Sequence, residues 1–347
     1  MVLNSCTKTK GLLSQFEINM KTKAVIVNKT GTPDVLEIQE IEVGEPKESE
    51  VRIRQSVIGV NFADIYQRRG SHGPYAASIF PMVIGGEASG FIDAIGKDAT
   101  GFGIGQRVAV IYPGAYQLTR NVPATNVVPL PDDISLEVAG SSLVRGLTAE
   151  YLLRRLYLVK AGDAVLIHAA AGGMGLILSQ WAHSLGALVI GTVGSKQKID
   201  LALKNGCDFV INYREDDFVS RVLEITSGKG VDVVYDAIGK DVFLDSLKCV
   251  KTLGFVISYG TASGDVEAFD LQLLHQKSII VARPTLRSFI SAPGDLQRGA
   301  AAFFEAIQNK VIDPTVRQLY PFENVRMAHK DLEEGLTTGS VGLVSGV

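Results

Sequence analysis

The stretch Val-Leu-Ile-His-Ala-Ala-Ala-Gly-Gly-Met-Gly, residues 165–175, decides the fold of this chain. An apolar run typical of a β-strand ends in very small residues, and a helical pattern begins directly after it. The unpaired N–H groups at a helix start attract phosphate, and only residues without bulk let a pyrophosphate approach the backbone. With Ala170 in the first glycine place, Gly172 and Gly175 fit the spacing of a dinucleotide fingerprint. A plain turn could use the same glycines, so the flanking strand and helix carry the prediction.

Apolar runs recur behind the glycines at the spacing of βα units, roughly 20 to 24 residues from start to start. They are continuous Val, Ile and Leu runs, as expected for a parallel sheet that is covered on both faces. The predicted strands are Leu188–Val193, Asp208–Tyr213, Val231–Asp236, Gly254–Tyr259 and Ser278–Ala282. The helical patterns between them are Leu176–Leu185, Ile199–Lys204, Asp217–Ile225 and Val242–Val250. The sequence therefore predicts a doubly wound α/β domain that binds a dinucleotide.

The end of the second predicted strand indicates which dinucleotide binds. NAD sites usually place an acid there, about 20 residues past the glycines, to bind the ribose hydroxyls. Here no acid precedes Asp200, whereas Ser195 and Lys198 would favour a 2′-phosphate, and Tyr213-Arg214 closes the third strand nearby. The alternative is that Lys196 and Lys198 are merely solvated lysines at the start of a helix. The missing acid and the clustered cations favour NADP(H).

Composition limits the classes of function. The 347 residues suffice for two domains, and 46% hydrophobic residues can fill two cores. A net charge of −3 predicts no nucleic-acid partner, and no apolar stretch approaches the length of a membrane span. The scattered cysteines Cys6, Cys207 and Cys249 suggest neither a disulfide framework nor a metal cluster, which favours the reducing cytoplasm.

The pattern of apolar runs and turn residues predicts four segments of the chain. Residues 1–20 read as a disordered extension, with a weaker organelle-targeting reading from Lys8 and Lys10. Residues 21–145 read as an all-β, partly open barrel, 146–282 as the nucleotide-binding domain, and 283–347 as a return to the barrel domain. The cleft between the domains is the expected site. The barrel strands are expected at Ala24–Val27, Val51–Val60, Ala88–Ile95, Arg107–Ile111 and Asn126–Val128, and the tail is expected to hold helices around Gly299–Asn309 and Val325–Gly335.

Residues 21–347 resemble the quinone oxidoreductases of the medium-chain dehydrogenase/reductase superfamily, the zeta-crystallin-like group. The resemblance spans nearly the whole chain in the family's order, and it implies a GroES-like barrel domain and a Rossmann domain that binds NADPH. The matching stretches are Gly-Val-Asn-Phe-Ala-Asp-Ile-Tyr (59–66), Gly-Gly-Glu-Ala-Ser-Gly (85–90), Arg-Gly-Leu-Thr-Ala (145–149), His-Ala-Ala-Ala-Gly-Gly-Met-Gly (168–175), Gly-Thr-Val-Gly (191–194), Ile-Asn-Tyr-Arg (211–214) and Val-Tyr-Asp-Ala-Ile-Gly (234–239).

The resemblance also implies the roles of individual residues. Asn61 and Tyr66 would line the nicotinamide and substrate end, and Thr148 would reach the cofactor from a helix. The remaining implied contacts are Gly172, Gly173 and Gly175 under the pyrophosphate, Ser195, Lys198 and Tyr213 at the adenosine phosphate, Ile238, Tyr259 and Gly260 at the nicotinamide ribose, and Arg283 to Thr285 across the domain junction.

Three positions depart from the family pattern. Arg145 stands where bacterial members carry Lys, and the two cations differ in geometry. Met174 replaces a usual Val, and only its backbone is expected to touch phosphate. The segment 334–339 lacks an Arg that some relatives use to assist the cofactor, which predicts a lower affinity for NADPH.

No metal is expected. A catalytic zinc needs about three converging Cys, His or acidic ligands, but Gly86 stands where a zinc enzyme has His. His168 reads as a hydrogen-bonded core residue, and His183, His275 and His329 as surface or packing residues, while His72 is a minor candidate for substrate contact. A short-chain dehydrogenase needs Tyr and Lys four residues apart, whereas Tyr157 and Lys160 are three apart.

The expected function is metal-free, NADPH-dependent reduction of quinones by hydride or electron transfer. Negative charge would develop on the acceptor oxygen, and Tyr66 and Asn61 are candidate donors to it. The alternative for this pair is a role in positioning the cofactor, and Asp64 is expected to orient its loop. Reduction of α,β-unsaturated carbonyls and non-catalytic NADPH binding stay open as functions. The resemblance implies a homodimer, with the strand Ser278–Ala282 as the expected edge.

Overall fold

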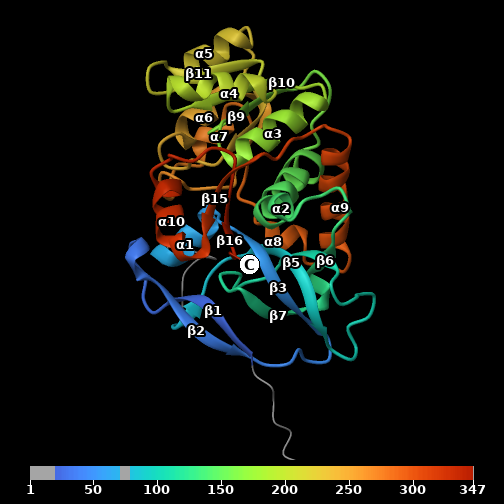
Figure 1. Ribbon diagram of the computed structural model, residues 1–347. Coiled ribbons are helices and arrows are strands. Elements are labelled where there is room, and N and C mark those ends of the chain that lie inside the picture. The colour runs from blue at the N-terminus through green and yellow to red at the C-terminus, as the bar shows by residue number, and fades with distance from the viewer. Residues whose placement is uncertain (1–19, 71–78, 347) are drawn as a thin grey trace, which may run out of the picture.

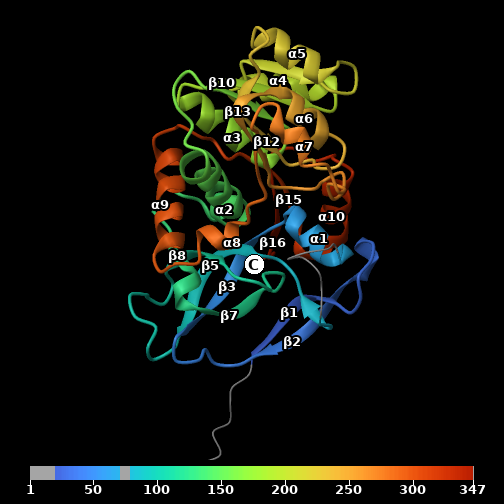
Figure 2. The same cartoon turned by 180° about the vertical axis from the view of Figure 1, so that it is seen from behind.

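The computed structural model describes residues 20–70 and 79–346. It has two parts, a sheet flanked by helices and an open barrel of strands, which lie one above the other in Figures 1 and 2. Residues 1–19 of the extension expected at 1–20, and the loop histidine His72, lie outside the described residues. Met20 begins the strand β1 (Met20–Val27).

A six-stranded parallel sheet forms the centre of the first part. Its strand order is β11-β10-β9-β12-β13-β14, so the chain starts in the middle and winds outward in both directions. This order confirms the predicted doubly wound fold. The strands are β9 (Ala164–Ile167), β10 (Leu188–Val193), β11 (Phe209–Asn212), β12 (Val231–Asp236), β13 (Val250–Ser258) and β14 (Ile280–Ala282).

Helices cover both faces of this sheet because successive strand side chains point to opposite sides. Val165 and Ile167 of β9 pack in one apolar cluster, and Leu166 between them packs in another. The helices of the first cluster are α2 (Leu136–Tyr151), α3 (Gly173–Ser184), α8 (Leu286–Phe289) and α9 (Asp295–Gln308), and those of the second are α5 (Phe218–Ile225), α6 (Phe243–Cys249) and α7 (Gln272–His275). The short α4 (Ile199–Lys204) follows β10.

The second part is built from two sheets. One has the order β2-β1-β4, and the other has the order β15-β16-β3-β5-β6-β8, with β7 paired to β3. The strand β16, from the end of the chain, pairs antiparallel with β3, and the helix α10 (Val325–Glu333) packs with them. The strands are β1 (Met20–Val27), β2 (Leu36–Val43), β3 (Glu50–Gly59), β4 (Met82–Val83), β5 (Glu87–Ile95), β6 (Arg107–Ile111), β7 (Thr119–Pro123), β8 (Val127–Pro129), β15 (Val316–Pro321) and β16 (Ser340–Val344).

Two helices contradict the expectation that the chain is all β up to residue 145. They are α1 (Phe62–Arg69) and the first part of α2. The pattern misses α2 because much of its buried face consists of small residues, such as Ala139, Gly140 and Ser142, which form no apolar stripe. The expected boundary after residue 145 falls inside α2, which packs against β3 and β5 and also against α3 and α9.

Candidate active site at the domain junction

The glycine turn lies between β9 and α3. Ala169 turns the chain in the left-handed region, with φ of 53°, and Gly172 is the last residue before the helix. A Cβ on Gly175 would lie 2.6 Å from the Cα of Ala170. That glycine therefore lets the first turn of α3 pack directly on the end of β9, which leaves the helix N–H groups pointing past the strand end.

Residues 335–339 cross this turn, and we call them the C-terminal strap. A Cβ on Gly173 would come within 2.7 Å of the carbonyl oxygen of Gly339. Toward the other end of the strap, the carbonyl oxygen of Gly335 accepts a hydrogen bond of 2.9 Å from Lys198 Nζ. The strap therefore contacts both the expected pyrophosphate turn and the expected phosphate-binding lysine.

The residues expected at the adenosine phosphate gather where β10 and β11 end. Ser195 directly follows the link after β10, and a Cβ on the neighbouring Gly194 would lie 3.1 Å from the Tyr213 hydroxyl. Burial and the nearby Arg214 lower the pKa of Lys198. The cations Lys198 and Arg214 and the hydroxyls of Ser195 and Tyr213 thus follow the neighbouring ends of β10 and β11.

An acid also lies close to this group. Glu215, just after β11, forms an ion pair of 3.3 Å with Lys196. The sequence argument searched for an acid only at the end of β10, and at the end of β11 it considered only Tyr213 and Arg214, so it missed this carboxylate. The ion pair with Lys196 offsets the negative charge of Glu215 in the neighbourhood of Lys198.

The expected nicotinamide side lies at the ends of β12 and β13. Asp236 accepts bonds of 2.8 Å and 3.0 Å from the backbone N–H groups of Ile238 and Gly239, which fixes the loop after β12. Its backbone carbonyl accepts bonds from the N–H groups of Tyr259 and Gly260. Burial raises the pKa of Asp236 to about 6. Sequence reasoning missed this residue, although an acid that closes a buried strand is a usable signal.

Arg283 joins the same group of loops. Its Nη1 donates to the carbonyl oxygens of Ser258, at 2.8 Å, and Gly260, at 3.2 Å. Thr285 lies two residues further on, at the N-cap of α8. The structure therefore brings Ile238, Tyr259, Gly260 and Arg283 together at one end of the sheet.

Tyr66 and Asn61 reach this region from the barrel part. The Tyr66 hydroxyl on α1 accepts a bond of 3.1 Å from the backbone N–H of Thr261, which lies beyond β13. Asn61, the N-cap of α1, donates from its Nδ2 to Oε1 of Glu87 at 2.7 Å. Its backbone N–H donates to Asp64 at 2.8 Å, so Asp64 holds the helix start as expected. Burial raises the pKa of both Tyr66 and Asp64, the latter to about 7.

Three further expected residues lie on α2 and α3. Arg145 is buried, and its guanidinium donates to the carbonyl oxygens of Ser141 and Val60. Thr148 donates its hydroxyl to the carbonyl oxygen of Val144 in its own helix, at 2.7 Å. Met174 packs its side chain against the apolar core.

Two of the histidines lie in polar core networks. His168 contacts the hydroxyls of Thr192 and Ser246, each at 2.9 Å, and burial lowers its pKa to about 3, so it is a neutral core residue as predicted. His329 is buried on α10 and contacts the Tyr116 hydroxyl at 2.9 Å.

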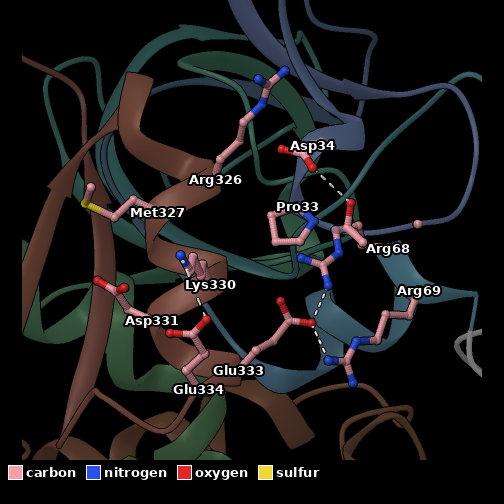
Figure 3. A pocket seen from close by; sticks show the side chains of 12 residues that line it. Pro33, Asp34, Arg68, Arg69, Arg326, Met327, Lys330, Asp331, Glu333 and Glu334 are labelled. Carbon is pink, nitrogen blue, oxygen red and sulfur yellow. Dashed lines mark hydrogen bonds and ion pairs between the residues drawn. The ribbon is translucent and has the colours of Figure 1, made fainter.

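A hollow of about 880 Å³ lies elsewhere, between α1, α10 and the short helix η1 (Pro33–Val35). Figure 3 shows Arg68 and Arg69 both reaching Glu333 there, with Lys330 directed toward Glu334. Among residues 20–70 and 79–346, none of those predicted to bind cofactor or substrate lines this hollow. The expected site is therefore defined by contacts at the junction of the two parts, and its place in a cleft stays a prediction.

The donor set does not suit a zinc ion. Within residues 20–70 and 79–346, no group of three or more His, Cys, Asp or Glu residues could hold a metal ion. Glu87 uses both carboxylate oxygens on Asn61 and the N–H of Val144. Among the helices of the same ranges, none is long and apolar enough to cross a membrane.

Comparison with known proteins places this geometry in a superfamily. Residues 47–153 match the alcohol dehydrogenase GroES-like domain, and residues 173–306 match the zinc-binding dehydrogenase model. These matches and the two-part fold define a medium-chain dehydrogenase/reductase.

Full-length relatives identify the branch. The chain is 41% identical to quinone oxidoreductase 1 of Escherichia coli over 91% of its length and 98% of that protein. It is 40% identical to a 2-haloacrylate reductase of a Burkholderia species, over 92% and 98% of the two chains. The structure of E. coli quinone oxidoreductase complexed with NADPH matches with a TM-score of 0.90 and covers 93% of this chain and 100% of that one. The chain belongs to the quinone oxidoreductase family.

Proposed function

We propose that this chain reduces quinones with NADPH at the junction of its two parts, by hydride or electron transfer and without a metal. The observation that carries the proposal is the gathering of the glycine turn, Lys198 and the loops after β12 and β13 at one end of the parallel sheet. Its support from the comparisons is an E. coli relative whose solved structure contains NADPH.

The residues at this end of the sheet fit NADPH. Gly172 and Gly173 are only half-buried and carry no side chain, so backbone is accessible at a helix start, where a pyrophosphate is favoured. Lys198 has three ammonium hydrogens, so it can keep its bond to Gly335 and still donate to a 2′-phosphate beside Ser195 and Tyr213. NADPH bound there would supply the reducing equivalents.

The acceptor end needs hydrogen-bond donors, because a reduced quinone oxygen gains negative charge. We infer that Tyr66 and Asn61 donate to that oxygen. Burial raises the pKa of Tyr66, which keeps its hydroxyl protonated at neutral pH. Its bond from the backbone N–H of Thr261 supports this role, because Thr261 follows the residues that are proposed to flank the nicotinamide.

The test is oxidation of NADPH by the purified full chain with 1,4-benzoquinone, 9,10-phenanthrenequinone and an alkenal. Turnover with the quinones supports the proposal. Tight NADPH binding without turnover on any acceptor would contradict it and identify a non-catalytic NADPH-binding protein.

A second candidate is reduction of the double bond of α,β-unsaturated carbonyls. The observation that favours it is the similarity to a 2-haloacrylate reductase, at an identity close to that of the quinone oxidoreductases. The ratio of kcat/KM for an alkenal to that for a quinone decides between them, and a ratio above one would make the enone reaction primary.

We also infer a homodimer formed through the edge strand β14. Ile280 on this strand is exposed, and so are Leu253, Leu271 and Leu273 nearby in the sequence of the same part. An unpaired apolar edge is covered most simply by a second copy. Light scattering is expected to give a dimer for the full chain and a monomer for Ile280→Lys, and a wild-type monomer would overturn this inference.

We further infer which segments bind the acceptor and NADPH, and in which cell compartment the chain lies. Residues 21–145 and 283–347 are proposed to bind the acceptor, and residues 146–282 to bind NADPH. Cys207 and Cys249 are buried free thiols, which supports the reducing cytoplasm as the compartment. Fractionation of cells that express the full chain tests this placement.

A further inference from the structure

Glu87 carries a buried carboxylate directly beside Asn61. It is the first residue of β5, and its side chain is fully shielded from solvent. Oε1 accepts from the Asn61 amide at 2.7 Å, and Oε2 accepts from the backbone N–H of Val144 on α2 at 2.7 Å. One carboxylate therefore joins the barrel, the start of α1 and the middle of α2.

The space for this carboxylate is created by a glycine. A Cβ on Gly59, the last residue of β3, would lie 2.7 Å from the carboxyl carbon of Glu87. Burial of an ionised group is unfavourable unless it is paired and hydrogen-bonded. Burial raises the pKa of Glu87, whereas the charge of buried Arg145 and the hydrogen bonds from Asn61 and Val144 oppose this effect and favour the ionised form. A Cβ on Gly173 would lie 2.9 Å from Nε of Arg145. Arg145 therefore lies between the chain before Asn61, where it donates to the Val60 carbonyl oxygen, and the glycine turn.

We propose that Glu87 is a positioning residue for the acceptor: it takes one amide hydrogen of Asn61 and fixes which atom of that carboxamide faces which way. A carboxylate only accepts hydrogen bonds, so the Asn61 nitrogen, and not its oxygen, must face Glu87. The second amide hydrogen is then held at a set angle for donation to the acceptor oxygen. This inference rests on the proposed quinone reduction.

The first variant is Glu87→Gln, which keeps the shape but offers one oxygen to two donors, Asn61 Nδ2 and Val144 N. We expect kcat with 1,4-benzoquinone to fall about 10- to 100-fold through misplacement of the donor. The NADPH dissociation constant, measured by fluorescence, is expected to stay within about twofold. Glu150→Gln, on α2 near its C-terminal end, is the matched control, because Glu150 is also a buried carboxylate but pairs with Arg155.

The second variant combines Asn61→Asp with Glu87→Gln and so reverses the direction of the hydrogen bond between positions 61 and 87. The new amide can donate to the carboxylate at position 61 while its oxygen accepts from Val144. We expect Tm to recover toward the wild-type value, whereas kcat stays low because position 61 no longer has an N–H to donate. If Glu87→Gln alone fails to fold, the double variant still tests the positioning role of Glu87.

The outcomes separate the two proposals. Wild-type kcat in folded Glu87→Gln, or recovery of kcat together with Tm in the reversed pair, would overturn the positioning role and leave quinone reduction intact. A wild-type chain that binds NADPH but reduces no acceptor would overturn the proposed function itself. The inference is supported if kcat falls in Glu87→Gln and stays low in the reversed pair although the Tm of that pair recovers.

Discussion

The ammonium group of Lys198 donates a hydrogen bond to the strap, and the residue lies near Ser195 and Arg214. A hydrogen bond from a charged group contributes about 1.5–3 kcal/mol. We therefore expect Lys198→Glu to weaken NADPH binding about 10- to 100-fold or more, because the new carboxylate would also repel the 2′-phosphate. NADH binding is expected to change much less.

Fluorescence titration with both cofactors measures this difference. Lys204→Glu, at the end of α4, is the control for a change of charge alone. An equal loss of affinity for NADPH and NADH would remove the assignment of Lys198 to the phosphate.

Asp236 predicts how stability depends on pH. Burial raises its pKa from 3.8 to about 6, so the folded chain binds this proton more tightly than the unfolded chain does. Between these two pH values the unfolded state carries fewer protons, and stability therefore falls as the pH rises. The amount is on the order of 3 kcal/mol.

Asp236→Asn keeps the oxygen that caps Ile238 and Gly239 and removes the titration. We expect Tm of this variant to change less than wild-type Tm between pH values of about 4 and 6. Scanning calorimetry across that window measures it, and parallel Tm curves for the two proteins would contradict the prediction.

At the scale of elements, the strap depends on a close approach of two glycines. Gly173→Ala places a Cβ within 2.7 Å of a backbone oxygen of Gly339, so the strap or the start of α3 must move. Such overpacking lowers stability by about 1–3 kcal/mol. We expect NADPH affinity to fall with it, because the same surface is proposed to hold the pyrophosphate.

Gly103→Ala is the matched control, since a Cβ there meets nothing within 4 Å. Tm and NADPH affinity are measured for both variants. Unchanged NADPH affinity in a destabilised Gly173→Ala would show that the strap is structural only.

The elements themselves were predictable where one pattern dominates. The bounds of β10, β12 and α4 agree with the prediction, because continuous apolar runs and short glycine joints fix them locally. α3 begins at Gly173 and not at Leu176, since the glycine turn itself forms the first helical turn. The first part of α2 escaped prediction because its small residues gain stability only from the strands that they pack against.

At the scale of the whole molecule, Tyr66 joins the two parts through Thr261. Tyr66→Phe keeps the ring and removes this bond together with the proposed donor. We expect kcat for 1,4-benzoquinone to fall about 10- to 100-fold while NADPH affinity changes little. Tyr320→Phe, which loses a hydroxyl bonded to Asp331, is the control. Equal kcat in the two variants would place Tyr66 outside the acceptor site.

The candidate site was only partly predictable, because some of its contacts join segments that are far apart in the sequence. Residues at the carboxyl ends of parallel strands, such as Lys198 and Tyr259, follow from the strand pattern. The partners of Asn61 and Gly173 could not be read locally, because Glu87 and Gly339 come from distant segments. Chain topology, rather than any motif, brings those pairs together.

The strand order of the barrel part also bears on synthesis. β3 leaves the ribosome early, but its neighbour β16 is made almost last, after the contiguous six-stranded sheet. The end of β3 that pairs with β16, at Val57–Gly59, must therefore wait without that partner while the nucleotide-binding part forms, although β7 already covers the same edge at Glu50–Arg54. A chain terminated before Ser340 would keep that end open for good, and open edges recruit other chains into aggregates.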